Sequence, residues 1–328
     1  MAECRGARAT VALIAAVLIV PFAAAGQEAT KVWRIGVLSP YSMAQDSPRL
    51  AALRAGLKDL GYVEGKNLVV DYRPAEGRFE RLPALAAEVA RLPWDVLVAH
   101  GDAAVPARQA TATMPIVFVA NPDPIGMGIA TSLARPGGNA TGLSDLHSEL
   151  VAKRLTFLKQ ALPSASRFGV VWNSRVPAHP SQLREIQTAA PALRITIVPV
   201  EVTGPQEFGR AFTTIKKEGV EAVTILGGAT GAHRRQFAAL AIQHRVPTIS
   251  TTREFAEDGL LMSYGSDFSE LYRRAATYVH RIVKGAKPGD LPIEQPTNFD
   301  LVINMKTANA LGLTIPPALL VQAAAVIR

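Results

Sequence analysis

The chain alternates short runs of β-branched residues with amphipathic runs along almost its whole length. A buried strand followed by a helix of about 10 to 15 residues is typical of βα units, which build parallel sheets covered by helices. The expected strands form two successive sets: 35–38, 68–72, 95–99 and 116–119 in the first, then 168–172, 195–202, 222–226, 248–250 and 260–264. The repetition predicts two similar α/β halves.

Helices are expected between these strands. Their predicted ranges are 50–60, 79–92, 103–112, 150–162, 180–190, 206–218, 233–244 and 268–284; a strand at 301–303, a helix at 306–311 and a final helix after Pro316 and Pro317 complete the chain. The tail beyond residue 264 is too short for a third domain. We therefore expect the chain to cross between the lobes several times, at about 141–145, 264–267 and 296–299.

The predicted fold class is α/β, with two doubly wound, Rossmann-like parallel sheets joined by a multi-strand hinge. The predicted segments are 33–143 with 266–297 for lobe 1, and 144–265 with 298–328 for lobe 2. With 48% hydrophobic and 19% charged residues, the composition is that of a globular protein with a real core.

Residues 1–25 have the pattern of a cleavable export signal. Arg5 and Arg8 precede an uncharged apolar run at 9–20, and Ala23, Ala24 and Ala25 supply small residues for cleavage before Gly26. The apolar run is shorter than the roughly 20 residues that a membrane-spanning helix needs; an uncleaved anchor is the alternative. The only cysteine, Cys4, precedes this run. We expect a periplasmic protein without thiol or disulfide chemistry.

The net charge of +8 does not indicate nucleic-acid binding, because the basic residues are dispersed. The doublets at 216–217, 234–235 and 273–274 lie far apart on predicted helices, and no basic run is interleaved with aromatic residues. A solvated basic surface explains the charge better. We expect a monomer that takes a small-molecule ligand and binds no nucleic acid.

Enzyme signatures are weak. The chain has no Gly-x-Ser-x-Gly elbow, and the glycine-rich run 227–231 is not followed by the Gly-Lys-Ser/Thr of a phosphate-binding loop. Its six histidines show no ligand spacing for a metal. The acidic residues Glu254, Glu257 and Asp258 are typical of a solvated helix. We expect no catalysis, no cofactor and no metal.

In open parallel sheets, ligands bind beyond the carboxyl ends of the strands. The candidate ligand-binding residues at those ends are Ser39, Pro40, Tyr41, His100, Gly101, Asp102, Asn121, Asp123, Ser144, Asn173, Gly227, Gly228, Thr230 and Tyr264. The N–H groups of the following helices suit a carboxylate. Several residues have a second reading: Asp102 is an N-cap or an acceptor for a ligand ammonium, Asn121 and Asp123 supply turn chemistry, and His100 and Tyr264 fit a core position.

Several stretches resemble the solute-binding components of ABC importers, in the tryptophan/tyrosine-type group. They are LKDLGYVEGKNL at 57–68, GRFERLP at 77–83, LARPGGNATGL at 133–143, LMSYG at 261–265, and the segments 284–292 and 311–317. The resemblance implies a type I periplasmic binding fold that closes on a small solute, which an ABC permease then receives. The chain departs from the family at Asp102, where members usually carry Thr or Ser, and in the small loop 227–231.

These observations predict a periplasmic solute-binding component of an ABC importer, with an amino acid or aromatic compound as the candidate ligand. One alternative is a ligand-sensing module for a membrane receptor. A secreted hydrolase or isomerase on the same fold is another, and it would need acid and base groups that converge in the cleft.

Overall fold

The computed structural model describes residues 31–176, 178–227 and 229–328. The predicted export signal at 1–25 lies outside the described residues. Within the described part of the chain, none of the helices combines the length and the apolar character needed to cross a bilayer.

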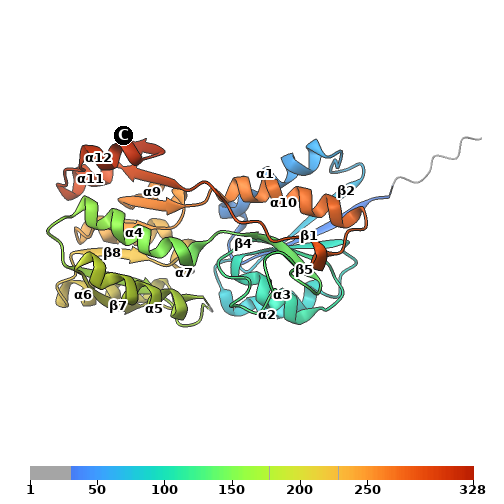
Figure 1. Ribbon diagram of the computed structural model, residues 1–328, viewed down its shortest axis with the longest axis horizontal. Helices are drawn as coiled ribbons and strands as arrows, with labels where there is room; N and C mark the ends of the chain where they lie inside the picture. Colours follow the sequence, from blue (N-terminus) through green and yellow to red (C-terminus); the bar gives the residue numbers. More distant parts are fainter. Residues whose placement is uncertain (1–30, 177, 228) are drawn as a thin grey trace, which may run out of the picture. The chain divides into compact units, whose positions relative to one another are not determined.

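The first sheet has five parallel strands in the order β2-β1-β3-β4-β5. Its strands are β1 (Trp33–Ser39), β2 (Leu68–Pro74), β3 (Val96–His100), β4 (Ile116–Asn121) and β5 (Ala140–Ser144). The helices α1 (Met43–Asp59), α2 (Leu82–Val89) and α3 (Ala104–Ala110) belong to the same run of chain, whereas α10 (Phe268–Val283) comes from far along the sequence. In Figure 1, α10 lies alongside α1.

Side chains alternate between the two faces of this sheet, as the pleat of a strand requires. In β3, Val96 and Val98 pack with the residues of α1 and α10, whereas Leu97 and Ala99 pack with those of α2 and α3. The helices α1 and α10 approach each other closely at Gly56, where an added Cβ would lie 2.6 Å from the carbonyl oxygen of Arg273. Both faces of the sheet are therefore buried.

The second sheet has seven strands in the order β12-β11-β10-β9-β8-β6-β7. They are β6 (Arg167–Trp172), β7 (Thr196–Glu201), β8 (Ala222–Ile225), β9 (Thr248–Ser250), β10 (Met262–Gly265), β11 (Asp300–Asn304) and β12 (Ala325–Ile327). Its helices are α4 (His147–Ala161), α5 (His179–Ala189), α6 (Phe208–Lys217), α7 (Ala229–Ala232), α8 (Arg234–Gln243), α9 (Arg253–Glu257), α11 (Met305–Leu311) and α12 (Pro317–Gln322). The pair β10/β11 is antiparallel and the other pairs are parallel.

The two sheets repeat one topology. The run β7-β6-β8-β9-β10 has the same order as β2-β1-β3-β4-β5, with β11 and β12 added at one edge. In this doubly wound order the first and third strands lie side by side, their connections leave in opposite directions, and a crevice opens beyond their carboxyl ends. The two crevices are expected between β1 and β3 and between β6 and β8.

Three segments connect the two sheets. The chain passes from β5 to α4, returns from β10 to α10, and passes again to β11. Neighbouring segments pair through the backbone at the crossing, where Ser144 N–H donates to the carbonyl of Glu294 at 2.9 Å and Glu294 N–H donates to that of Gly142 at 3.0 Å. The Ser266 hydroxyl donates to the carbonyl of Asp145 at 3.2 Å.

The predicted fold class is confirmed, but some predicted elements were wrong. Helix α1 begins at Met43 and not at Leu50, although Pro48 lies inside it. The Gln45 side-chain oxygen accepts from Ser42 N–H at 3.2 Å and caps the earlier start. The predicted helix 233–244 is confirmed as α8, whereas the short helix α7 before it was not predicted, and the acidic residues Glu254 and Glu257 lie on α9. The tail ends in the strand β12, which pairs with β11.

Candidate ligand-binding site

A cavity of about 60 Å³ lies at the carboxyl ends of both sheets. The cavity lies where the topology predicts the two crevices. Residues after β1 and β3 line one side of it, and residues after β6 and β8 line the other. The lining residues are Pro40, Tyr41, Arg49, His100, Gly101, Asp102, Ala120, Pro122, Asp145, Val176, Ala178, His179, Gln182, Leu226, Gly227, Gly231, Arg234, Thr251, Thr252, Phe255 and Phe268.

Six of the residues proposed from the sequence line this cavity: Pro40, Tyr41, His100, Gly101, Asp102 and Gly227. Gly228 lies outside the described residues. Seven others do not line it, namely Ser39, Asn121, Asp123, Ser144, Asn173, Thr230 and Tyr264.

Six of these residues hold the loops beside the cavity, and the seventh, Tyr264, packs against the core. The Ser39 hydroxyl accepts from Tyr41 N–H at 3.1 Å, and the Asn121 amide donates to the carbonyl of Gly101 at 3.1 Å. Asp123, Ser144 and Asn173 each accept from a backbone N–H two or three residues further on, and the Thr230 hydroxyl donates to the carbonyl of Gly227. The ring of Tyr264 packs against that of Phe157, with 4.8 Å between centroids. A direct contact of these side chains with ligand stays a prediction.

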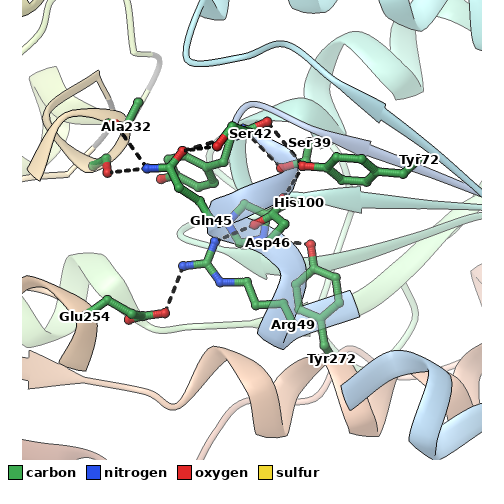
Figure 2. A network of polar contacts seen from close by, with 12 residues as sticks. Ser39, Ser42, Gln45, Asp46, Arg49, Tyr72, His100, Ala232, Glu254 and Tyr272 are labelled. Atoms are coloured by element: carbon green, nitrogen blue, oxygen red, sulfur yellow. Dashed lines mark hydrogen bonds and ion pairs between the residues drawn. The ribbon is translucent and has the colours of Figure 1, made fainter. Parts of the chain in front are cut away.

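Arg49 is the centre of a charged cluster that the sequence analysis missed. Its side chain is buried; Nη1 lies 2.8 Å from Asp46 Oδ1 on the same helix, and Nη2 lies 3.2 Å from Glu254 Oε1 on α9 (Figure 2). The Tyr72 hydroxyl donates to the other oxygen of Asp46 at 2.8 Å. The cluster therefore joins an element of the first sheet to an element of the second.

The pKa values in this cluster reflect its pairing. Burial alone would lower the pKa of Arg49, but Asp46 and Glu254 outweigh burial and raise it. Burial works to raise the pKa of Glu254, yet Arg49 lowers it below its ordinary value. The guanidinium also lies over the rings of Tyr41 and Phe268, at 5.3 and 5.0 Å from their centroids. Arg49 thus stays charged and is held on several sides.

His100 lines the cavity beside Arg49 and is uncharged at neutral pH. Burial, reinforced by the positive charge of Arg49, lowers the pKa of His100 to about 4. Its Nδ1 shares a hydrogen bond of 3.0 Å with the Tyr272 hydroxyl. The centroid of its ring lies 5.3 Å from that of Tyr41 and 5.4 Å from that of Phe268. At neutral pH this histidine contributes no positive charge to the cavity.

Asp102 presents a different environment. Its Oδ1 is buried and has no hydrogen-bond partner among the described residues. Burial raises the pKa of Asp102 to about 7, and the nearby carboxylate of Asp145 adds to the effect. The interpretation of Asp102 as an N-cap is not met, since α3 begins after Ala103 and that cap position makes no side-chain hydrogen bond.

Further contacts join the two sides of the cavity. The Gln45 amide donates to the carbonyls of Gly231 and Ala232, at 3.0 and 3.1 Å (Figure 2). On the side of the second sheet, Arg234 Nε forms an ion pair with Asp258. The hydrogen bonds of Gln45 and the ion pair between Arg49 and Glu254 bring the two sides together and leave little space between them, whereas the pair of Arg234 with Asp258 lies within the second side.

The other lining residues that were missed include His179, Gln182 and Arg234. Arg234 was read as part of a solvated basic doublet, although its neighbour Arg235 is the exposed member of the pair. His179 begins the helix after β6, the same position that α1 takes after β1, and this equivalence was the available signal. Among the residues that the structure describes, no group of His, Cys, Asp and Glu could hold a metal ion.

Comparison with known proteins decides the family. Residues 35–327 match the family described as "ABC transporter substrate binding protein". The chain belongs to this family. Its members bind solutes and are not enzymes, they act outside the cytoplasm, and they work with ABC transporter components.

Individual relatives agree with this assignment. A solved structure of a conserved domain protein from Vibrio cholerae is 31% identical, with a TM-score of 0.83 over 90% of this chain and 100% of that one. An ABC domain from Streptococcus pneumonia in complex with L-Trp is 25% identical, with a TM-score of 0.81 over 89% and 100%. A tyrosine-binding protein of Clostridioides difficile is 25% identical over 262 residues, which are 78% of this chain and 74% of that one.

Proposed function

We propose that this substrate-binding protein takes an aromatic or amino-acid-like solute in the cavity between its two sheets and delivers it to an ABC permease of the inner membrane. The observation that carries the proposal is the cavity itself, because both sheets contribute the residues at their topological switch points. Export by cleavage of the segment 1–25, a periplasmic location and a monomeric state belong to the same proposal.

The chemistry of the lining supports an aromatic solute. Tyr41, Phe255 and Phe268 line the cavity, and ring faces and edges favour flat ligands. Two similar proteins are described as a tyrosine-binding protein and as a domain in complex with L-Trp. The lining also contains charged and amide side chains that can fix the orientation of a polar group.

Entry of such a solute requires the two sides to separate. The cavity of about 60 Å³ is much smaller than the roughly 300–1,000 Å³ of small-molecule sites. We propose that lobe 1 (33–143 and 266–297) and lobe 2 (144–265 and 298–328) move about the three connecting segments. A solute that contacts both sides would shift the population toward the closed form.

Native mass spectrometry on protein purified from its own host, followed by a thermal-shift panel of amino acids, aromatic amines, aromatic acids and nucleosides, tests binding. We expect a saturable rise in Tm with one class, and recovery of the solute unchanged. Uptake of that solute by a host strain that lacks the protein should fall. A flat panel, or chemical conversion of the bound molecule, would contradict the proposal.

A further inference from the structure

The charged groups that line the cavity differ in their pairing within the protein: the arginines form ion pairs, whereas one oxygen of Asp102 has no hydrogen-bond partner among the described residues. The described lining residues include two guanidinium groups, Arg49 and Arg234, and no lysine. Arg49 uses Nη1 for Asp46 and Nη2 for Glu254, and Arg234 is paired with Asp258. The positive charges at this wall are therefore already matched by protein carboxylates.

Asp102 is the opposite case. It lines the cavity, and its buried Oδ1 has no hydrogen-bond partner among the described residues. A buried carboxylate oxygen without a donor is costly, and the cost disappears when a donor with positive charge reaches it. Asp145 lines the same cavity, and its carboxylate, which also interacts with the guanidinium of Arg154, disfavours the ionised form of Asp102. A cation in the cavity would relieve both effects.

A carboxylate in the solute would meet the reverse situation. It would lie near Asp102 and Asp145, while the two guanidinium groups remain engaged and His100 is neutral. The rings of Tyr41 and Phe268 are already occupied by the guanidinium of Arg49, so Asp102 is the group beside them that is available to a cation. The whole wall thus favours a cation over an anion.

We propose that Asp102 accepts a hydrogen bond from a cationic amine of the solute, and that the site prefers an amine to the corresponding zwitterionic amino acid. This inference rests on the proposed function, since it assigns the class of solute for the same cavity. Asp102 is then the residue that determines specificity for charge. It binds the ammonium that an amine and an amino acid share, and its negative charge, with that of Asp145, repels the carboxylate that only the amino acid carries.

Isothermal titration calorimetry with three matched probes tests the preference. Tyramine, tyrosol and L-tyrosine share a phenol and differ in carrying an ammonium, a hydroxyl or a zwitterion. We expect tyramine to bind at least ten-fold more tightly than either of the others. Asp102→Asn should reduce tyramine affinity at least ten-fold and abolish the difference, whereas the charge-matched control Asp290→Asn, at an exposed position far along the chain, should leave affinity unchanged.

A pH series on the unmodified protein provides a test that does not depend on how the variant folds. Tyramine keeps its charge between pH 5.5 and 8.5, whereas Asp102, with a pKa of about 7, loses its negative charge as the pH falls from 8.5 to 5.5. We expect affinity to fall about 30-fold from pH 8.5 to 5.5, as the ionised fraction falls. The titratable and charged groups that line the same cavity are Tyr41, Arg49, His100, Asp145, His179 and Arg234.

The outcomes are distinct. Equal or tighter binding of L-tyrosine, equal binding of tyrosol, or a flat pH profile would overturn the role of Asp102. If another solute class in the wider panel gives a saturable Tm shift while tyramine gives none, the inference fails and the proposed function stands. If nothing in the panel binds, both fail.

Discussion

Arg49 and Asp102 line the same cavity, but their charges have opposite surroundings. Arg49 is bonded to a buried carboxylate on its own helix and to a second carboxylate on α9, and two rings cover it. Asp102 has a buried oxygen without a partner. A charge that the protein has already paired contributes to the conformation, whereas a charge left without a partner is available to a ligand. Arg49 therefore has a structural role and Asp102 a role in ligand recognition, although both line the same cavity.

Removing Arg49 should have the largest effect on stability. Arg49→Met leaves the buried Asp46 and the partly buried Glu254 without their cation, and breaking one partner of a buried pair such as Arg49 and Asp46 costs about 3–5 kcal/mol. Urea unfolding at pH 7 measures the loss. The control is Arg54→Met, whose pair with Glu64 is exposed and should be worth less than about 1 kcal/mol. Similar losses in the two variants would show that the cluster has no special structural role.

Asp102→Asn should instead stabilise the protein as the pH rises. The pKa of Asp102 is raised from 3.8 to about 7 by burial, so the folded protein binds the extra proton and ionisation costs stability between these pH values. The variant removes that cost. We expect its advantage to grow by up to about 1.4 kcal/mol per pH unit from about pH 4 to 7 and then remain constant.

The lowered pKa of His100 allows a second test of the environment of Asp102. Its pKa is lowered from 6.5 to about 4, so its contribution to stability is lost as the pH falls from about 6.5 to 4. In the unmodified protein, His100 and Asp102 act in opposite directions over this window. Urea unfolding of Asp102→Asn from pH 7 to pH 4.5 should therefore show a steeper acid loss than the parent. Parallel curves would contradict the unusual environment of Asp102.

Glu254→Gln should have the smallest effect. The glutamine keeps an oxygen that can accept from Arg49 Nη2, while Asp46 remains to balance the guanidinium, so we expect a loss of about 1 kcal/mol. Because Glu254 is the member of the cluster on the second sheet, small-angle scattering should also show a larger share of open molecules. Glu257→Gln, exposed on the same helix, is the control. An unchanged scattering profile would mean that this ion pair does not hold the two sides together.

The fold could be predicted from the sequence because its signals are local. Buried strands such as β3 and amphipathic helices such as α10 carry their periodicity in consecutive residues. Strand order is not local, and it decides that the ends of β1 and β3 meet at the cavity. Six of the residues chosen at strand ends line the cavity because they follow these strands or β8. A place at one of these strand ends is not sufficient, since Ser39, Asn173 and Thr230 lie at or beyond the ends of β1, β6 and β8 and bond to backbone groups of their own loops instead.

The place of Arg49 in the cavity could not be predicted from the sequence, and the reason is physical. Its position depends on where α1 begins, and the predicted helix 50–60 leaves Asp46 and Arg49 outside it. Once the helix starts at Met43, Asp46 and Arg49 lie three residues apart on one face and can pair. The partner on α9 comes from more than 200 residues further along, and no local pattern indicates such a contact. Asp102 was noticed because a carboxylate at a strand end is conspicuous, but its missing partner is a property of the fold.

The late position of α10 in the sequence determines when the first sheet can finish folding during synthesis. It covers the face of the first sheet that carries Val96 and Val98, yet it is encoded after ten of the twelve strands. A nascent chain therefore holds this apolar face uncovered until residue 283 has been synthesised, and a product that stops near residue 260 exposes it permanently. Premature termination should yield insoluble fragments and no half-sized soluble domain.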